Sequence, residues 1–332
     1  MRIGIVTPAP PDSLYGNRIT ALRWARILRH LGNGVSILQN YARQPYDLLV
    51  ALHARRSHSS IVQFKRENPD VPVIVALTGT DLYRDLRTSH QARESLDLAT
   101  RIVVLQPKAI EELKPGLRDK TRVIYQSVED GSVEGGARGK SAKSRLTTLE
   151  RRSRRSFDVC VIGHLRAVKD PFRTAMAARL LPPSSNIRVL QVGAAMTDAM
   201  ASKALRERRV NQRYEWLGER SRSQVRRILA NSQICAISSR MEGGANVMSE
   251  AITASVPILA SRIDGNIGIL GAEYPGYFDV GDTKELAQLL TRMETSSEYR
   301  AELRSWVKRL AFLFSPALEQ KAWAGLISEL FG

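Results

Sequence analysis

Short apolar runs alternate with amphipathic stretches along the first 128 residues. Several runs are apolar at every position, as expected of parallel strands that are covered on both faces. After the first run, Trp24, Ile27, Leu28 and Leu31 follow the i, i+3, i+4, i+7 spacing of a helix, which Gly32 is placed to end. The pattern predicts a doubly wound parallel sheet. Its strands are expected at residues 2–8, 35–38, 47–53, 71–78, 101–106 and 121–127.

The alternation restarts after residue 156, with apolar runs at 157–165, 186–193, 214–218, 233–239 and 256–261. From about Thr283 onward the pattern is helical. The predicted fold class is α/β, with Rossmann-like domains at 1–128 and 157–314. A C-terminal helix at 315–332 is expected to pack back toward the N-terminal domain. Ligands of such sheets bind at the carboxyl ends of the strands, so the cleft between the domains is the expected site.

The basic segment 129–156 separates the two domains and differs from both in composition. It is rich in Gly, Ser and Arg, shows little apolar periodicity, and carries eight basic and four acidic side chains. Such a composition favours a flexible linker or surface insert.

The chain has 332 residues and a formal net charge of +17, and this positive excess is spread over both domains. Aromatic residues are only 6% of the chain, whereas nucleic-acid binders interleave aromatics with concentrated charge. We therefore expect small anionic substrates and neither a nucleic acid nor a membrane as partner; the oligomeric state stays open. No signal peptide or spanning segment is evident, and Cys160 and Cys235 lie in apolar runs as buried thiols, which favours a cytoplasmic protein.

The stretch 238–261 places a loop and a helix between two predicted strands. Gly243 and Gly244 allow backbone amides to approach a ligand closely, and the N-terminus of the following helix favours a phosphate. Glu250, about one turn into the helix, could accept hydrogen bonds from both hydroxyls of a ribose. Glu242, in the loop, could do the same for a sugar hydroxyl.

This stretch resembles the E-x7-E signature of the group 1 (family 4) nucleotide-sugar glycosyltransferases. The resemblance implies a GT-B fold, in which two Rossmann-like domains face a cleft. It also implies that Glu250 holds the ribose of the donor nucleotide and that Glu242 contacts the transferred sugar. The amides of the loop would hold the donor diphosphate, through the backbone of Gly243, Gly244, Ala245, Asn246 and Val247.

Residues 163–172 resemble the segment of the same family whose cations neutralise the donor diphosphate. Lys169 matches the family lysine. The family arginine is replaced by His164, and Arg166 is the candidate substitute. Cations are needed here because the departing nucleotide diphosphate gains negative charge in the transition state.

Residues 10–28 resemble the glycine-rich loop and first helix of the fold, so Gly16 and Asn17 are expected to open that helix toward the diphosphate. Residues 77–85 lie where many members have an acceptor-side histidine. Thr78 replaces that histidine, Thr80 follows it, and Asp81 is kept. An alcohol acceptor generally needs a group that takes its proton, and the candidates left are Asp81, His53 and His90.

Several motifs in order, at 16–28, 52–57, 77–85, 103–107, 123–127 and 158–173, resemble the selenosugar synthases of selenoneine biosynthesis. That resemblance implies transfer from UDP-N-acetylglucosamine or UDP-glucose to the selenium of selenophosphate. Because selenophosphate is already an anion, its attack requires no general base. Contacts to it are expected from Arg18, Arg55, Arg56, His53, Thr78 and Thr80.

Two other functions stay open. One is an ordinary sugar transferase with a hydroxyl acceptor, whose donor half would look the same. The other is a non-catalytic protein that binds RNA or another polyanion through the basic segment 129–156. No Asp-x-Asp metal motif is evident, so we expect an enzyme without a metal or other cofactor.

Overall fold

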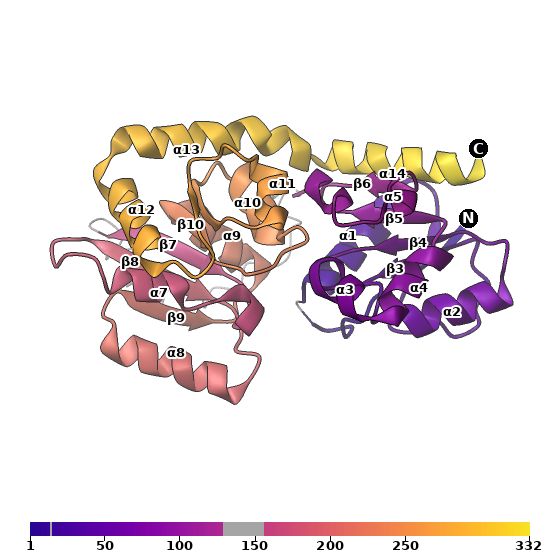
Figure 1. The fold of residues 1–332 in the computed structure, drawn as a ribbon, viewed down its shortest axis with the longest axis horizontal. Coiled ribbons are helices and arrows are strands. Elements are labelled where there is room, and N and C mark those ends of the chain that lie inside the picture. The colour runs from indigo at the N-terminus through magenta and orange to yellow at the C-terminus, as the bar shows by residue number, and fades with distance from the viewer. Residues whose placement is uncertain (14, 129–155) are drawn as a thin grey trace, which may run out of the picture.

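The computed structural model describes residues 1–13, 15–128 and 156–332. Its elements form two lobes that lie side by side, with the last two long helices running along one edge of both (Figure 1). The predicted linker at 129–156 lies outside the described residues, apart from Ser156.

The N-terminal domain is built on a parallel sheet of six strands in the order β2-β1-β3-β4-β5-β6. The strands are β1 (Arg2–Val6), β2 (Gly34–Leu38), β3 (Leu48–Leu52), β4 (Val73–Ala76), β5 (Arg101–Val104) and β6 (Thr121–Val123). Helices and short helical turns connect them: α1 (Gly16–His30), α2 (His58–Glu67), η1 (Asp81–Asp85), α3 (Leu86–Thr88), α4 (His90–Leu98), η2 (Pro107–Ile110) and α5 (Pro115–Arg118).

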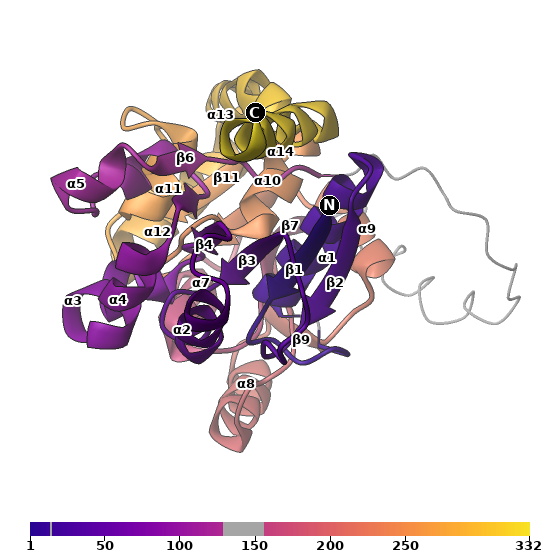
Figure 2. The same ribbon diagram turned by 90° about the vertical axis from the view of Figure 1, so that its right-hand side faces the viewer.

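β3 shows why these runs are apolar at every position. Leu48, Val50 and Leu52 point into the hydrophobic core shared with α1, whereas Leu49 and Ala51 point into the core on the opposite face, with α2 and α4. Figure 2 shows the sheet from its edge, between these helices. Alternate side chains of a strand face opposite sides, so two covered faces require a continuous apolar run.

The C-terminal domain repeats this plan with a parallel sheet in the order β12-β11-β10-β7-β8-β9. Its strands are β7 (Phe157–Ile162), β8 (Ile187–Val192), β9 (Tyr214–Gly218), β10 (Ile234–Ile237), β11 (Ile258–Ser261) and β12 (Tyr277–Phe278). The sequence pattern missed β12, because two residues are too few to show a period. The helical elements are η3 (Ala167–Lys169), α7 (Arg173–Ala178), α8 (Asp198–Val210), α9 (Arg222–Asn231), α10 (Asn246–Thr253), α11 (Asp264–Leu270), α12 (Thr283–Thr295), α13 (Ser297–Leu310) and η4 (Ala311–Phe314).

The last helix, α14 (Pro316–Phe331), lies against the N-terminal domain, while α13 lies along the C-terminal one (Figure 1). Trp323 is fully buried and packs edge-on against Trp24 of α1, with ring centroids 4.9 Å apart. Glu319 accepts a hydrogen bond from the Trp24 indole at 2.8 Å and others from the backbone and hydroxyl of Ser127. The C-terminal helix therefore completes the core of the N-terminal domain.

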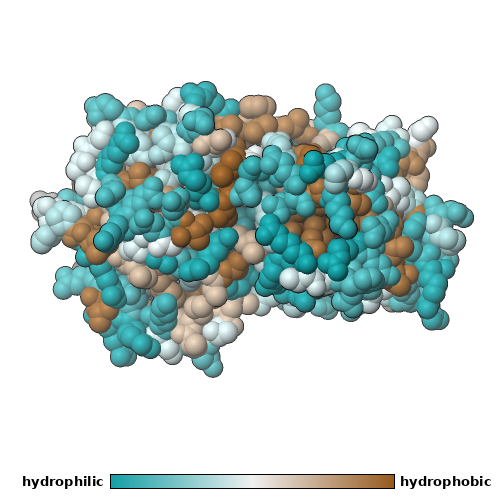
Figure 3. Space-filling view, viewed as in Figure 1, coloured by the Kyte–Doolittle hydropathy of each residue, from teal (hydrophilic) through white to brown (hydrophobic). Residues whose placement is uncertain are grey.

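The two domains also meet directly. An ion pair joins Lys108 of η2 to Asp264 of α11 at 3.8 Å. Figure 3 shows hydrophobic surface along the line where the lobes meet, near the passage from α13 to α14, where Phe312 is 67% exposed. None of the helices that the structure describes combines the length and apolar composition needed to cross a membrane. The predicted fold class, two Rossmann-like domains with a helical C-terminal tail, is confirmed.

Candidate active site

A pocket between the two domains, called the cleft pocket below, opens to solvent, and together with the solvent at its mouth it measures about 940 Å³. Its N-terminal wall is formed by Gly16 and Ile19 of α1. Its C-terminal walls come from the loops after β7, β8 and β9 and from α9 and α10. These residues are Ile162, Gly163, His164, Arg166, Lys169, Val192, Gly193, Glu219, Arg220, Arg222, Val225, Ala245, Asn246, Val247 and Glu250.

The loop after β10 leads into α10, which forms one wall of the cleft pocket. The N-cap residue Ala245 provides no side-chain hydrogen bond to the first turn. The amides at the start of α10 are therefore not capped by their own N-cap residue, and the helix dipole adds a partial positive charge there. Such a helix start suits a phosphate.

Gly243 lies where the same loop approaches the N-terminal domain. A Cβ at this position would stand 2.6 Å from the backbone nitrogen of Gly79, closer than real side chains come. Only glycine allows the loop to touch the turn after β4, which carries Thr78. The loop of the donor-like segment and the predicted acceptor-side turn are thereby brought into contact.

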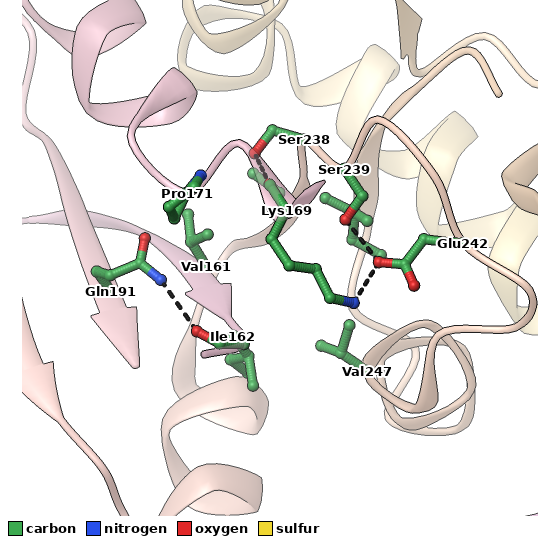
Figure 4. A pocket seen from close by; sticks show the side chains of 12 residues that line it. Val161, Ile162, Lys169, Pro171, Gln191, Ser238, Ser239, Glu242 and Val247 are labelled. Carbon is green, nitrogen blue, oxygen red and sulfur yellow. Dashed lines mark hydrogen bonds and ion pairs between the residues drawn. The ribbon is translucent and has the colours of Figure 1, made fainter. Parts of the chain in front are cut away.

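Glu242 forms an ion pair with Lys169, and its Oε1 atom also accepts a hydrogen bond from Ser239 at 2.6 Å. Figure 4 shows the lysine reaching from η3 across a smaller pocket toward this carboxylate. Lys169 and Val247 line both this pocket and the cleft pocket, so the two spaces adjoin. The ion pair therefore stands where a group bound in the cleft pocket would extend into the smaller one.

Glu250 faces the cleft pocket from α10. Burial raises the pKa of its carboxyl group above the ordinary value, and the charges of Arg222, Arg23 and Arg226 oppose that rise. Among the described residues, none is hydrogen-bonded to this carboxylate. Its oxygens are therefore available to a ligand in the pocket.

The segment after β7 turns sharply at Gly163, whose φ of +156° is rarely adopted by residues with side chains. His164 accepts a hydrogen bond from the amide of Ala194 at 3.2 Å and packs edge-on against Tyr15 of the N-terminal domain. Arg166 is exposed and precedes η3, which ends at Lys169. Arg166 and Lys169 both line the cleft pocket, where their positive charges could neutralise a bound diphosphate.

On the N-terminal side, α1 begins at Gly16, and this residue lines the cleft pocket. Asn17 and Arg18 follow on the helix and are not part of the described lining. The Nε atom of Arg18 is buried and has no hydrogen-bond partner within the part of the chain that the structure describes.

Asp81 is fully buried, and its carboxylate accepts backbone hydrogen bonds from three residues. The donors are the amides of Thr78 at 3.0 Å, Gly79 at 2.8 Å and Ala54 at 3.2 Å. The carboxylate therefore ties the turn after β4 to the end of β3. This arrangement positions a loop, and it leaves the carboxylate poorly placed to take a proton from a substrate.

The other acceptor-side candidates gather around the end of β3. His53 is buried, its Nε2 atom lies 3.3 Å from the hydroxyl of Thr80, and its Nδ1 atom accepts from the amide of Arg56 at 3.4 Å. Burial lowers the pKa of the His53 imidazole. Arg55 is bound to Asp85 at 2.9 Å. His90 is exposed at the start of α4.

The structure thus gathers most donor-side candidates around the two pockets, whereas the acceptor-side turn at Thr78 touches the donor loop at Gly243. Lys169, Arg166, Glu250, Gly16 and the 245–247 backbone share the cleft pocket, with Glu242 in the adjoining one. The described lining of both pockets leaves out the predicted acceptor contacts: Thr78, Thr80, Arg18, Arg55, Arg56 and His53.

Sequence reasoning missed the pocket residues that follow β9. Glu219 and Arg220 come directly after this strand, and Arg222 opens α9. The rule that ligands bind at the carboxyl ends of strands could have identified them, because the strand itself was predicted. Arg23, on α1, was also missed, and no sequence pattern marks it.

Within residues 1–13, 15–128 and 156–332, no cluster of three or more His, Cys, Asp or Glu side chains is arranged to hold a metal ion. Cys160 and Cys235 are both buried and free, on neighbouring strands. A hydrogen bond with the Cys160 thiol, together with burial, raises the pKa of Cys235.

Comparisons with known proteins point to one group. Residues 150–309 match the family "Glycosyl transferases group 1". Crystal structures of HepE from Anabaena, in complex with UDP and with UDP-glucose, are 16% and 17% identical to the chain, each with a TM-score of 0.76. Each comparison spans 99% of this chain, and the two comparisons span 99% and 100% of the respective HepE chains.

Sucrose-phosphate synthase from Thermosynechococcus elongatus is similar to the same extent, with 16% identity, a TM-score of 0.76 and 99% coverage of both chains. At these identities the structural likeness shows the fold, and it agrees with the predicted GT-B arrangement. Among curated protein sequences, none matches the chain significantly.

Proposed function

We propose that this chain acts as a group 1 glycosyl transferase, and the match of residues 150–309 to that family supports the proposal. The chain is a glycosyltransferase that uses a nucleotide sugar. The observation that carries this proposal is the cleft pocket, which gathers the start of α10, the cations Arg166 and Lys169, and the carboxylate of Glu250. A nucleoside diphosphate needs this combination of groups.

The donor is a UDP-sugar. Its ribose hydroxyls donate hydrogen bonds to Glu250, and its diphosphate lies against the amides that begin α10, with Lys169 and Arg166 as counter-charges. The transferred sugar extends toward Glu242, in the adjoining pocket. The fold shared with HepE, which has been solved with UDP and with UDP-glucose, supports UDP as the nucleotide.

Catalysis in this site consists of orienting the donor and stabilising the leaving group. As the bond to the anomeric carbon breaks, its electron pair passes to the diphosphate, and Lys169 and Arg166 face the charge that develops. A pair of unit charges about 4 Å apart is worth about 4 kcal/mol at an effective dielectric constant near 20. The ion pair with Glu242 holds Lys169 in place for this task.

The acceptor is selenophosphate, and the product is a 1-selenosugar of selenoneine biosynthesis. The selenium lone pair attacks the anomeric carbon, a C–Se bond forms, and UDP leaves. Water then cleaves the Se–P bond and releases phosphate. The acceptor side supports an anionic nucleophile, because the Asp81 carboxylate is occupied by three amides and burial disfavours a proton on His53.

An anaerobic assay tests this proposal. Purified protein is incubated with UDP-N-acetylglucosamine or UDP-glucose, and with selenophosphate, thiophosphate or neither, while UDP release and product mass are measured. Selenium-dependent UDP release with a selenosugar mass is the expected result. UDP release that depends on a hydroxyl compound and ignores selenophosphate overturns the acceptor and favours the ordinary sugar transferase.

The same assay tests the predicted independence from metals. The chain's own cations face the diphosphate, so treatment with EDTA should leave turnover unchanged. Loss of turnover with EDTA and its recovery with Mg²⁺ or Mn²⁺ would contradict this prediction.

A further inference from the structure

Arg23 connects the two domains inside the site. It belongs to α1 of the N-terminal domain and is only 7% exposed. Its Nη2 atom donates a hydrogen bond of 2.8 Å to the side-chain oxygen of Asn246, the first residue of α10. A side chain of the N-terminal domain thus reaches the helix that lines the cleft pocket.

The position of Arg23 on α1 explains this reach. Gly16 and Ile19 line the cleft pocket. Arg23 lies seven residues after Gly16 and four residues after Ile19 on the same helix. Residues at these spacings share one face of a helix, so the face that lines the pocket continues into Arg23. The helix is held in this orientation by Trp24, whose indole is bound to Glu319 of α14.

Arg23 also belongs to the charges around Glu250. The cations that face this carboxylate are Arg222 and Arg226 of α9 and Arg23 of α1. Arg23 is therefore the member of this trio that comes from the opposite domain. The other charges that face Arg23 are Glu319 on α14 and Arg26 on α1.

One nitrogen of the Arg23 guanidinium makes no hydrogen bond among the described residues. This atom, Nη1, is buried. A buried polar group without a partner is unfavourable, because it has lost its hydrogen bonds to water. The same guanidinium is bound to Asn246 and is one of the three positive charges around Glu250.

We propose that Arg23 is a positioning residue through which the N-terminal domain completes the donor-nucleotide site. It holds Asn246 at the start of α10 and keeps Glu250 ionised, so that both are ready for a UDP-sugar. This inference rests on the proposed function. The donor site is therefore complete only when the two domains are close enough for Arg23 to reach Asn246.

The consequence for pH follows from the charges. An ionised Glu250 accepts hydrogen bonds from both ribose hydroxyls, whereas a protonated one has lost part of that capacity. Burial raises the pKa of Glu250 and the three arginines oppose the rise. Removing Arg23 must raise this pKa further, so the variant binds UDP less tightly at lower pH and recovers as the pH increases.

Calorimetric titration of the full chain with UDP, between about pH 6 and about pH 8.5, tests the inference. The variants are Arg23→Gln, Arg23→Lys and the matched control Arg29→Gln, which removes an exposed arginine farther along α1. Arg23→Gln should weaken UDP binding roughly tenfold near neutral pH, as the loss of one charge-assisted hydrogen bond predicts. Its affinity should rise with pH where that of the wild type is flat.

Arg23→Lys should restore the flat pH profile, because the charge near Glu250 returns, and should recover only part of the affinity. Arg29→Gln should bind UDP as the wild type does. Equal UDP affinity of Arg23→Gln and wild type at every pH overturns the inference. So does a uniform loss in both Arg23 variants with a lowered melting temperature, which a purely structural role predicts. If the wild type itself does not bind UDP, the proposed function fails first.

Discussion

Lys169 and Glu242 stand 73 positions apart in the sequence, yet they form the ion pair at the junction of the two pockets. Each was predicted as a site residue from its own motif. Their pairing was not, because a motif gives the residue type and the loop, whereas the pairing depends on how β7 and β10 lie side by side in the sheet.

Replacing Lys169 with Ala tests the role of this cation. The variant removes a charge that faces the departing UDP and leaves Glu242 without its partner. We expect kcat to fall about 100-fold or more, since removal of one group that stabilises developing charge typically has this effect. Steady-state kinetics with a UDP-sugar measures it.

Lys203→Ala is the matched control, because Lys203 stacks on Phe172 away from both pockets. This control should keep the kcat of the wild type. A Lys169→Ala enzyme with kcat within about twofold of wild type would show that the leaving group is stabilised elsewhere.

Replacing Asp81 with Ala distinguishes a positioning carboxylate from a general base. The change leaves the buried amides of Thr78, Gly79 and Ala54 without their acceptor, so the free energy of unfolding should fall by about 1–3 kcal/mol or more. The remaining activity should keep the pH profile of the wild type. Urea unfolding and the pH dependence of kcat measure the two effects.

Asp70→Ala, at an exposed position, serves as the control and should change stability by less than about 0.5 kcal/mol. Normal stability of Asp81→Ala together with the loss of one limb of the pH profile would identify Asp81 as the base.

At the scale of elements, the hydrophobic pattern predicted eleven of the twelve strands that the structure describes, because most are apolar runs, such as β3 and β10, which are buried throughout. It missed β12, which has two residues. The helical tail was predicted as well. Its packing toward the N-terminal domain was expected too, but the pattern does not give the residues it meets: Trp323 and Leu326 share a core with Trp24 of α1.

Trp323→Ala measures what α14 contributes to the N-terminal domain. The indole is fully buried against Trp24, and truncation of such a side chain costs about 3–5 kcal/mol. The urea midpoint should fall accordingly. Phe312→Ala, at an apolar position that is 67% exposed in η4, is the control and should shift stability by less than about 0.5 kcal/mol.

An effect of Trp323→Ala as small as that of Phe312→Ala would mean that α14 does not hold the N-terminal domain together. A transition that splits into two steps would instead show that α14 couples the unfolding of the two domains.

At the scale of the whole molecule, two domains with the same plan could be predicted from a pattern that occurs twice. Their mutual placement could not, because it depends on single contacts such as Gly243 against Gly79 and Arg23 against Asn246. These contacts join residues that are far apart in the sequence, and neither glycine nor arginine is unusual in a loop or a helix.

Gly243→Ala tests whether the close approach of the two loops sets the arrangement of the domains. The added Cβ would stand 2.6 Å from the backbone of Thr78 and Gly79, and a backbone neighbour cannot rotate away as a side chain can. The domains should therefore separate at this point, with an increase in the radius of gyration by small-angle X-ray scattering and a loss of activity. Gly325→Ala, on α14, adds a Cβ that meets no atom within 4 Å and should leave both quantities unchanged.

If the Gly243→Ala variant has the scattering and the activity of the wild type, the loops adjust locally and the contact does not control the arrangement of the domains. If activity falls while the radius of gyration is constant, the loop acts on the bound donor within one domain, and the two-domain account of the site must then rest on Arg23 alone.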